Sequence, residues 1–192
     1  MYMTDIILYG GSFNPPHISH LLFATSQRAF FPDAEVWIAP TYSHAFHKSL
    51  MPFDLRLRML HAMFEDIRGI KISTIERDLH ESTSYTIDVV RALKQQNPDA
   101  VIHIAVGADI VPTLPQWREY EALCSLAEFL IFPREGYDNT MAVSIPHLPE
   151  ISSSEIRDCM ERGDYETVRR FVPRRVLDIL QEYALKPCQS HD

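Results

Sequence analysis

Residues 10–20 read Gly10-Gly11-Ser12-Phe13-Asn14-Pro15-Pro16-His17-Ile18-Ser19-His20 and directly follow the short apolar run Ile6–Tyr9. An apolar run of this length is typical of a buried strand, and glycines at its end let the backbone turn sharply and approach a ligand. Proline suits the start of a helix, because the N–H that it lacks would have no partner there. The stretch therefore predicts a strand, a glycine turn and a helix.

The two histidines of this stretch indicate an anion site. Apolar residues between Ile18 and Ala29 recur at helical spacing, so His17 and His20 lie three apart at the helix start and share one face. A helix N-terminus carries free N–H groups and partial positive charge, and it binds phosphate well. Either histidine taken alone could be a surface or capping residue, but the combination of strand, glycines, prolines and histidine pair favours a phosphate site.

Composition narrows the class of protein. The chain has 192 residues and a net charge of −8, which disfavours binding to nucleic acid or to an anionic membrane. No apolar stretch has membrane-spanning length, and no basic segment precedes the first apolar run as in a signal peptide. Three cysteines in no Cys-x-x-Cys arrangement favour a reducing compartment and indicate no metal site. We expect a cytoplasmic protein.

Strand and helix patterns alternate along the chain. Strands are expected at residues 6–9, 35–39, 70–72, 101–106 and 129–132, with a sixth at 143–145. Helices are expected at 53–67, 84–96 and 117–123. This alternation predicts an α/β fold, a Rossmann-like doubly wound parallel sheet of about five or six strands with helices on both faces. We expect one domain over residues 1–192, with a helical part from about 152 and a frayed tail from about 186.

A second informative segment is Ile151–Arg157, which reads Ile-Ser-Ser-Ser-Glu-Ile-Arg. Ser152 and Glu155 form a capping box, and Gly163 fits the position just after a helix, so a helix is expected over about 153–162. Arg157 lies one turn inside and could pair with an anion at that N-terminus. An ordinary capped helix would explain the serines alone.

Together the two segments resemble a known family. His-x-x-His is the shared motif of nucleotidyltransferases related to class I aminoacyl-tRNA synthetases, and the Gly-Gly-Ser-Phe-Asn-Pro-Pro-His form resembles the nicotinate/nicotinamide mononucleotide adenylyltransferases, in particular the bacterial nicotinate type. The resemblance runs from about Asp5 to Val172. It implies that His17, His20 and Arg157 are catalytic.

The resemblance also implies binding residues. For ATP these are Gly10, Gly11, Ser12, Phe13, Gly107, Asp109, Ser152, Ser153, Ser154, Lys48 and Arg134. For the acceptor they are Asn14, Ser84, Tyr85, Thr86 and Trp117. Helix capping by Asp109 and a core position for Trp117 are the structural alternatives. The loop before Lys48 reads His44-Ala45-Phe46-His47 and departs from the family's Pro-Pro-His-Lys. In the helix that follows, we expect at least one of Arg56 and Arg58 to be exposed.

The implied reaction joins ATP and nicotinate mononucleotide into nicotinate adenine dinucleotide (deamido-NAD) and pyrophosphate, a step of NAD biosynthesis. Because the attacking phosphate is already an anion, no general base is needed, and Mg²⁺ is expected mainly on the ATP phosphates. Alternatives are a nicotinamide or dual-specificity enzyme, a phosphopantetheine adenylyltransferase, which Trp117 and residues 84–86 disfavour, and a silent nucleotide sensor, which the intact histidines and Arg157 disfavour. The expected partners are ATP and a pyridine mononucleotide, and self-association into a homo-oligomer is left open.

Overall fold

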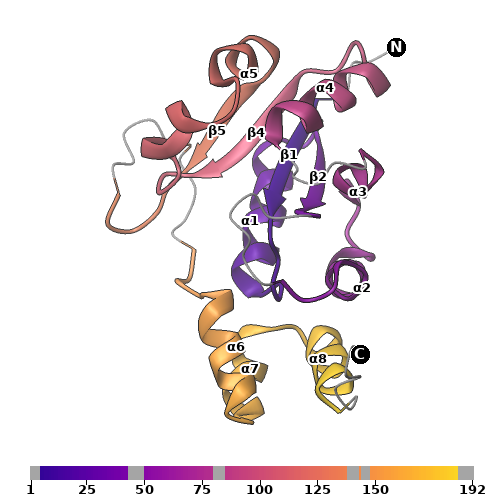
Figure 1. Ribbon diagram of the computed structural model, residues 1–192, viewed down its shortest axis with the longest axis vertical. Coiled ribbons are helices and arrows are strands. Elements are labelled where there is room, and N and C mark those ends of the chain that lie inside the picture. Colours follow the sequence, from indigo (N-terminus) through magenta and orange to yellow (C-terminus); the bar gives the residue numbers. More distant parts are fainter. Residues whose placement is uncertain (1–4, 43–49, 80–84, 138–142, 144–147, 186–192) are drawn as a thin grey trace, which may run out of the picture.

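The computed structural model describes residues 5–42, 50–79, 85–137, 143 and 148–185. The strands are β1 (Ile6–Gly11), β2 (Glu35–Pro40), β3 (Ile70–Ile72), β4 (Ile102–Gly107) and β5 (Glu128–Phe132). The helices are α1 (Ile18–Phe30), α2 (Phe53–Phe64), α3 (Ile75–Asp78), α4 (Thr86–Gln96), the 3-10 helix η1 (Val111–Gln116), α5 (Tyr120–Leu126), α6 (Ser153–Glu161), α7 (Tyr165–Phe171) and α8 (Arg174–Ala184). In Figure 1 the helices α6, α7 and α8 lie together below the sheet.

The sheet is parallel and doubly wound, as the alternation predicts. Its order is β3-β2-β1-β4-β5, so the chain moves outward in one direction from β1 and in the other from β4. The pairing of β1 with β4 ends at Leu8 and Ile104, although both strands continue to Gly11 and Gly107 against their outer neighbours. Two central strands that part at their carboxyl ends leave a crevice at the switch in strand order, where ligands bind in such sheets.

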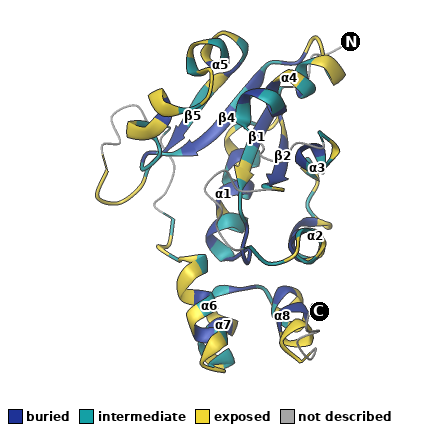
Figure 2. Cartoon of the chain, viewed as in Figure 1, coloured by how far each residue is buried: buried dark blue, intermediate teal, exposed yellow. Residues whose placement is uncertain are grey.

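Each face of the sheet buries its own apolar cluster, because successive side chains of a strand point to opposite faces. Ile7 and Ile38 pack on one face with α1, α2 and the C-terminal helices. Leu8 and Trp37 pack on the other face with residues of α3, α4 and α5. Figure 2 shows the result, with largely buried strands between helices that keep an exposed side.

The turn after β1 differs from the prediction. Both glycines remain within the strand, and the residue with left-handed backbone is Phe13, at φ 46°. Phe13 is fully buried, and its ring lies so close to Gly11 that a Cβ there would meet it at 3.1 Å. Burial of this ring offsets the backbone strain of about 1–3 kcal/mol at a non-glycine residue. Gly11 is therefore required for close packing rather than for the turn.

Other boundaries also differ from those expected. The helix expected at 117–123 is η1 followed by α5, with Trp117 between them, and α3 was not expected. Of the expected sixth strand, Val143 donates its N–H to the Ile131 carbonyl at 2.8 Å, whereas residues 144–145 lie outside the described residues. Helix α6 has the predicted Ser152–Glu155 capping box, and Gly163 after it has positive φ.

Candidate functional site

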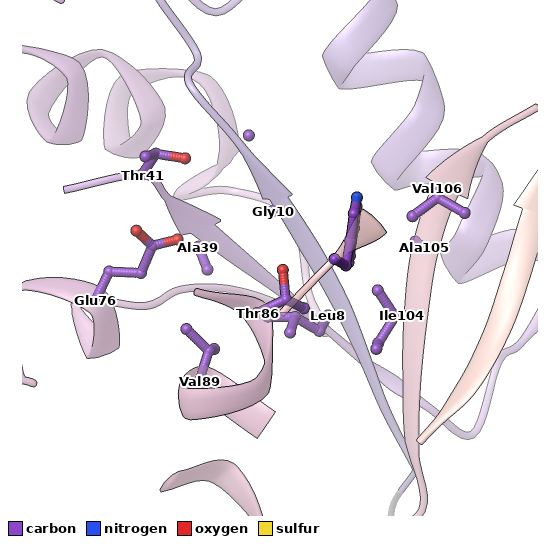
Figure 3. A pocket seen from close by; sticks show the side chains of 12 residues that line it. Leu8, Gly10, Ala39, Thr41, Glu76, Thr86, Val89, Ile104, Ala105 and Val106 are labelled. Atoms are coloured by element: carbon purple, nitrogen blue, oxygen red, sulfur yellow. The ribbon is translucent and has the colours of Figure 1, made fainter. Parts of the chain in front are cut away.

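A pocket of about 160 Å³ opens where β1 and β4 part. Its lining comes from strand ends and from two helices: Leu8, Gly10, Gly11, Ala39, Thr41, Glu76, Thr86, Val89, Ile104, Ala105, Val106 and Trp117. Figure 3 shows Thr86, Val89 and Glu76 beside the ends of β1 and β2, with Ile104 to Val106 along β4. A Cβ added at Gly10 would meet nothing within 4 Å, so this backbone faces open space in which a ligand can approach it closely.

The two histidines meet at the start of α1. His17 is the N-cap residue and His20 is the third helical residue, and their ring centroids are 3.7 Å apart. The backbone N–H of His17 donates to Nδ1 of His20 at 3.1 Å. Because Nδ1 accepts, the proton of a neutral His20 lies on Nε2, which is then a donor. Phe13 packs edge-on against the His20 ring at 5.0 Å and supports it.

Both imidazoles are neutral at pH 7. Burial, together with the nearby guanidinium of Arg134, lowers the pKa of His17 to about 4. Burial also lowers the pKa of His20 well below its usual value, with further contributions from His17 and Arg134. Desolvation also raises the pKa of the partly buried Tyr9, which packs on Phe13, so this side chain keeps its proton. The pair therefore offers neutral N–H donors rather than fixed positive charges.

The segment Ser12–Pro16, here called the phosphate loop, is tied to the start of α6. Ser153 Oγ donates to the Pro15 carbonyl at 2.9 Å, and Arg157 Nη1 donates to the Asn14 carbonyl at 2.6 Å. Arg157 Nη2 also donates to Ser154 Oγ at 2.9 Å, while Ser152 Oγ caps the helix by accepting from the Ser154 N–H. The two predicted anion-binding segments thus lie side by side, and three serine hydroxyls already have partners within the chain.

Asp109 and Arg134 lie together at the ends of β4 and β5. Arg134 Nε is 3.4 Å from Asp109 Oδ1, which is buried and has no hydrogen-bond partner among the described residues. Asp109 does not cap a helix, because η1 begins at Val111 with Ile110 as its cap. A Cβ at Gly107 would overlap with Asp109 Oδ1, so a larger residue here would displace the Asp109 side chain. The predicted ATP-side residues Gly107, Asp109 and Arg134 are therefore in mutual contact.

Two of the predicted acceptor residues, Thr86 and Trp117, line the same pocket. Thr86 is the first residue of α4 and Tyr85 is its N-cap, so the first N–H groups of this helix are free of intrahelical partners. Trp117 follows η1, and its half-buried ring packs edge-on against Phe129 at 6.2 Å. It lines the pocket and is not a core residue. Arg118 lies over the Tyr85 ring at 4.7 Å and so joins the Trp117 segment to α4.

Three further predicted residues are Lys48, Ser84 and Asn14. Lys48 and Ser84 lie outside the described residues. Asn14 is buried, and its Oδ1 accepts from the Met51 N–H at 2.9 Å, whereas its Nδ2 has no partner among the described residues.

Two further residues lie near the site: Glu76, which no sequence motif indicates, and Arg56, for which the sequence predicts only that it or Arg58 is exposed. Glu76 lines the pocket and accepts from the Tyr42 N–H at 2.9 Å. Arg56 is 1% exposed, whereas the side chain of Arg58 is half exposed and paired with Glu182. Helical spacing nevertheless indicates that Arg56 is buried. It lies three residues before Met59 and four before Leu60, so it shares the buried face of α2 with them.

Within the described residues, no group of three or more His, Cys, Asp or Glu side chains could hold a metal ion. The same part of the chain contains no helix long and apolar enough to cross a membrane.

Known proteins match this chain over most of its length. The cytidylyltransferase-like family matches residues 8–159. A probable nicotinate-nucleotide adenylyltransferase of Myxococcus xanthus is 36% identical, over 95% of this chain and 94% of the relative. One from Streptococcus pneumoniae is 33% identical, over 93% of this chain and 87% of the relative.

A solved structure has the same fold. The Plasmodium falciparum nicotinic acid mononucleotide adenylyltransferase complexed with NaAD matches with a TM-score of 0.80 at 22% identity, over 95% of this chain and 97% of that one. The extent and level of the sequence matches settle the relationship: the chain belongs to the cytidylyltransferase-like family and, within it, to the nicotinate-nucleotide adenylyltransferases.

Proposed function

We propose that this chain transfers the adenylyl group of ATP to the 5′-phosphate of nicotinate mononucleotide, giving nicotinate adenine dinucleotide and pyrophosphate. The observation that supports the proposal most is the pocket that Thr86 and Trp117 line together with Gly10 and Gly11, because these glycines lead directly into the phosphate loop that Arg157 holds and that ends at the histidine pair. The sequence relatives named as nicotinate-nucleotide adenylyltransferases support the same reaction.

The chemistry requires positioning and charge stabilisation more than proton transfer. An oxygen of the acceptor phosphate forms a bond to the α-phosphorus of ATP, and the bond from that phosphorus to the bridging oxygen breaks, so pyrophosphate leaves with the electron pair. The attacking oxygen is already anionic, so no residue acts as a base. Neutral N–H donors from His17 and His20 stabilise charge that grows on the α-phosphate, an effect that strengthens in a site with little water.

The leaving pyrophosphate needs cations and N–H donors. We assign this role to Arg157, to the α6 N-terminus at Ser152–Ser154, and to Arg134, whose guanidinium already influences both imidazoles. From the resemblance alone, Lys48 is assigned to the same phosphates. Asp109 Oδ1 is buried and accepts no hydrogen bond from the residues that the structure describes, so it is suited to accept one from a ribose hydroxyl.

Magnesium is proposed to enter on ATP. The groups of this chain that face the phosphates are N–H donors and guanidinium ions, which fit phosphate oxygens rather than a cation. The ion would neutralise part of the phosphate charge, while Arg157, Arg134 and the start of α6 orient the phosphates of ATP.

The acceptor ring is assigned to the Trp117 side of the pocket. Trp117 offers a face for stacking, and the free N–H groups at the start of α4, together with Thr86, suit a carboxylate. An amide would direct its own donors at these donors and leave groups unpaired. The acidic Glu76 lines the same pocket. Burial lowers the pKa of the nearby Arg56 guanidinium, and the charge of Glu76 offsets part of that effect, so the two opposite charges partly cancel.

The proposed location is the reducing cytoplasm, since Cys124 and Cys159 are both free thiols, one of them exposed. Pyrophosphate release, measured with ATP and a panel of phosphorylated acceptors, tests the function. Release with pyridine mononucleotides and not with phosphopantetheine supports it. Release with phosphopantetheine instead indicates the other transferase, and ATP binding without release indicates a sensor.

A further inference from the structure

Arg56 is among the largest side chains that are fully enclosed in this protein. It is 1% exposed, although arginine is seldom buried completely unless its charge and its donors have partners. It lies on α2, outside the groups to which the reaction has been assigned. Burial lowers the pKa of this guanidinium and the nearby Glu76 raises it, so an acidic group offsets part of the cost of enclosing the charge.

The donors of Arg56 join two segments that are distant in sequence. Nη1 donates to the Ser12 carbonyl at 2.9 Å, and Nε donates to the Met51 carbonyl at 3.0 Å. The guanidinium also lies over the Phe53 ring at 5.4 Å, which orients it. Ser12 begins the phosphate loop, and Met51 precedes α2. A planar guanidinium can serve both carbonyls at once, whereas a single ammonium group cannot match this fork.

The phosphate loop is thereby held from two sides. On the α2 side, Arg56 binds Ser12 and the Met51 N–H binds Asn14 Oδ1. On the α6 side, Arg157 binds the Asn14 carbonyl and Ser153 binds the Pro15 carbonyl. The loop leads directly into His17, so a shift of its first residues would move the histidine pair relative to Arg157.

We propose that Arg56 is a positioning residue for adenylyl transfer: it fixes the phosphate loop against Met51, so that His17, His20 and Arg157 meet the same phosphates. This inference rests on the proposed function. It assigns no contact between Arg56 and substrate. A loss of alignment of about 1 Å costs up to about a hundredfold in rate, which sets the size of the expected effect.

The test compares substitutions at Arg56 with the same substitutions at Arg58 on the same helix. Arg56→Lys keeps the charge and loses the fork, and Arg56→Gln keeps a donor and removes the charge. Both should lower kcat about 10- to 100-fold, with KM for ATP changed by less than about threefold. Arg58→Lys and Arg58→Gln should leave kcat unchanged, because that side chain is half exposed and pairs only with Glu182 among the described residues.

Rates are expressed per folded molecule, with the folded fraction taken from the melting curve of each variant. Turnover by the wild type and the Arg58 variants tests the proposed function by itself, so its failure is distinguishable from failure at Arg56. A folded Arg56 variant with kcat within about threefold of wild type would overturn the positioning role. The role is also overturned if neither Arg56 variant folds, or if the folded fraction accounts for the whole loss, because Arg56 would then serve the fold alone.

Discussion

The geometry of the site makes its most detailed prediction for the replacement of His20. Its ring has two functions that different atoms perform. Nδ1 accepts from the His17 N–H at 3.1 Å and completes the helix start, while Nε2 is the donor proposed for the α-phosphate. His20→Ala removes both functions. His20→Gln keeps an acceptor at the third helical position, where glutamine is a usual partner in a capping box, and removes the imidazole donor.

The two variants therefore separate stability from catalysis. Loss of one preorganised donor to developing charge costs about 2.7–4 kcal/mol in the transition state, or about a hundred- to a thousandfold in kcat, and both variants should show it. Loss of a helix cap costs about 1 kcal/mol of folding free energy, and only His20→Ala should show that. The assay is pyrophosphate release at saturating ATP and nicotinate mononucleotide, with chemical denaturation for stability. A folded His20→Gln variant that loses less than about threefold in kcat would refute the assignment of Nε2.

Two further predictions follow from the site. Trp117→Ala should raise KM for the acceptor, by an amount equivalent to about 1–3 kcal/mol by analogy with base stacking, and leave KM for ATP nearly unchanged; a rise for ATP alone would place the ring on the adenine side. The pKa of His17 is about 4 in the folded protein and about 6.5 in the unfolded chain. Between about pH 4 and pH 6.5 the unfolded chain therefore binds more protons than the folded protein. Stability should therefore fall as pH drops from about 6.5 to 4, by at most about 1.4 kcal/mol per pH unit for this residue, and less steeply in His17→Gln; denaturation curves with equal slopes would contradict this.

Much of the fold follows from local patterns. Short runs such as Val36–Ala39 are apolar on both faces, as strands of a covered parallel sheet must be, so the strand positions are predicted to within one or two residues. The start of α6 is predicted from Ser152 and Glu155 and its end from Gly163, because capping involves only residues that are neighbours in sequence.

Features that depend on distant contacts were missed. The turn after β1 was assigned to glycines, yet Phe13 takes the left-handed backbone because its ring is buried against Gly11, Tyr9 and His20. The contact of Arg134 with Asp109 joins two strand ends, and no spacing in the sequence encodes it. Arg56 could have been separated from Arg58 by helical phase, but its partners at Ser12 and Met51 are set only by the tertiary fold.

The central claim is adenylyl transfer to an acidic pyridine mononucleotide, and kcat/KM for nicotinate and nicotinamide mononucleotide with saturating ATP tests it most directly. We predict that one dinucleotide and one pyrophosphate form per turnover and that the acid is the better acceptor, since the start of α4 presents N–H donors beside Thr86. Equal values for the two acceptors would contradict the acid-selective pocket. Absence of any dinucleotide with either acceptor would contradict adenylyl transfer itself.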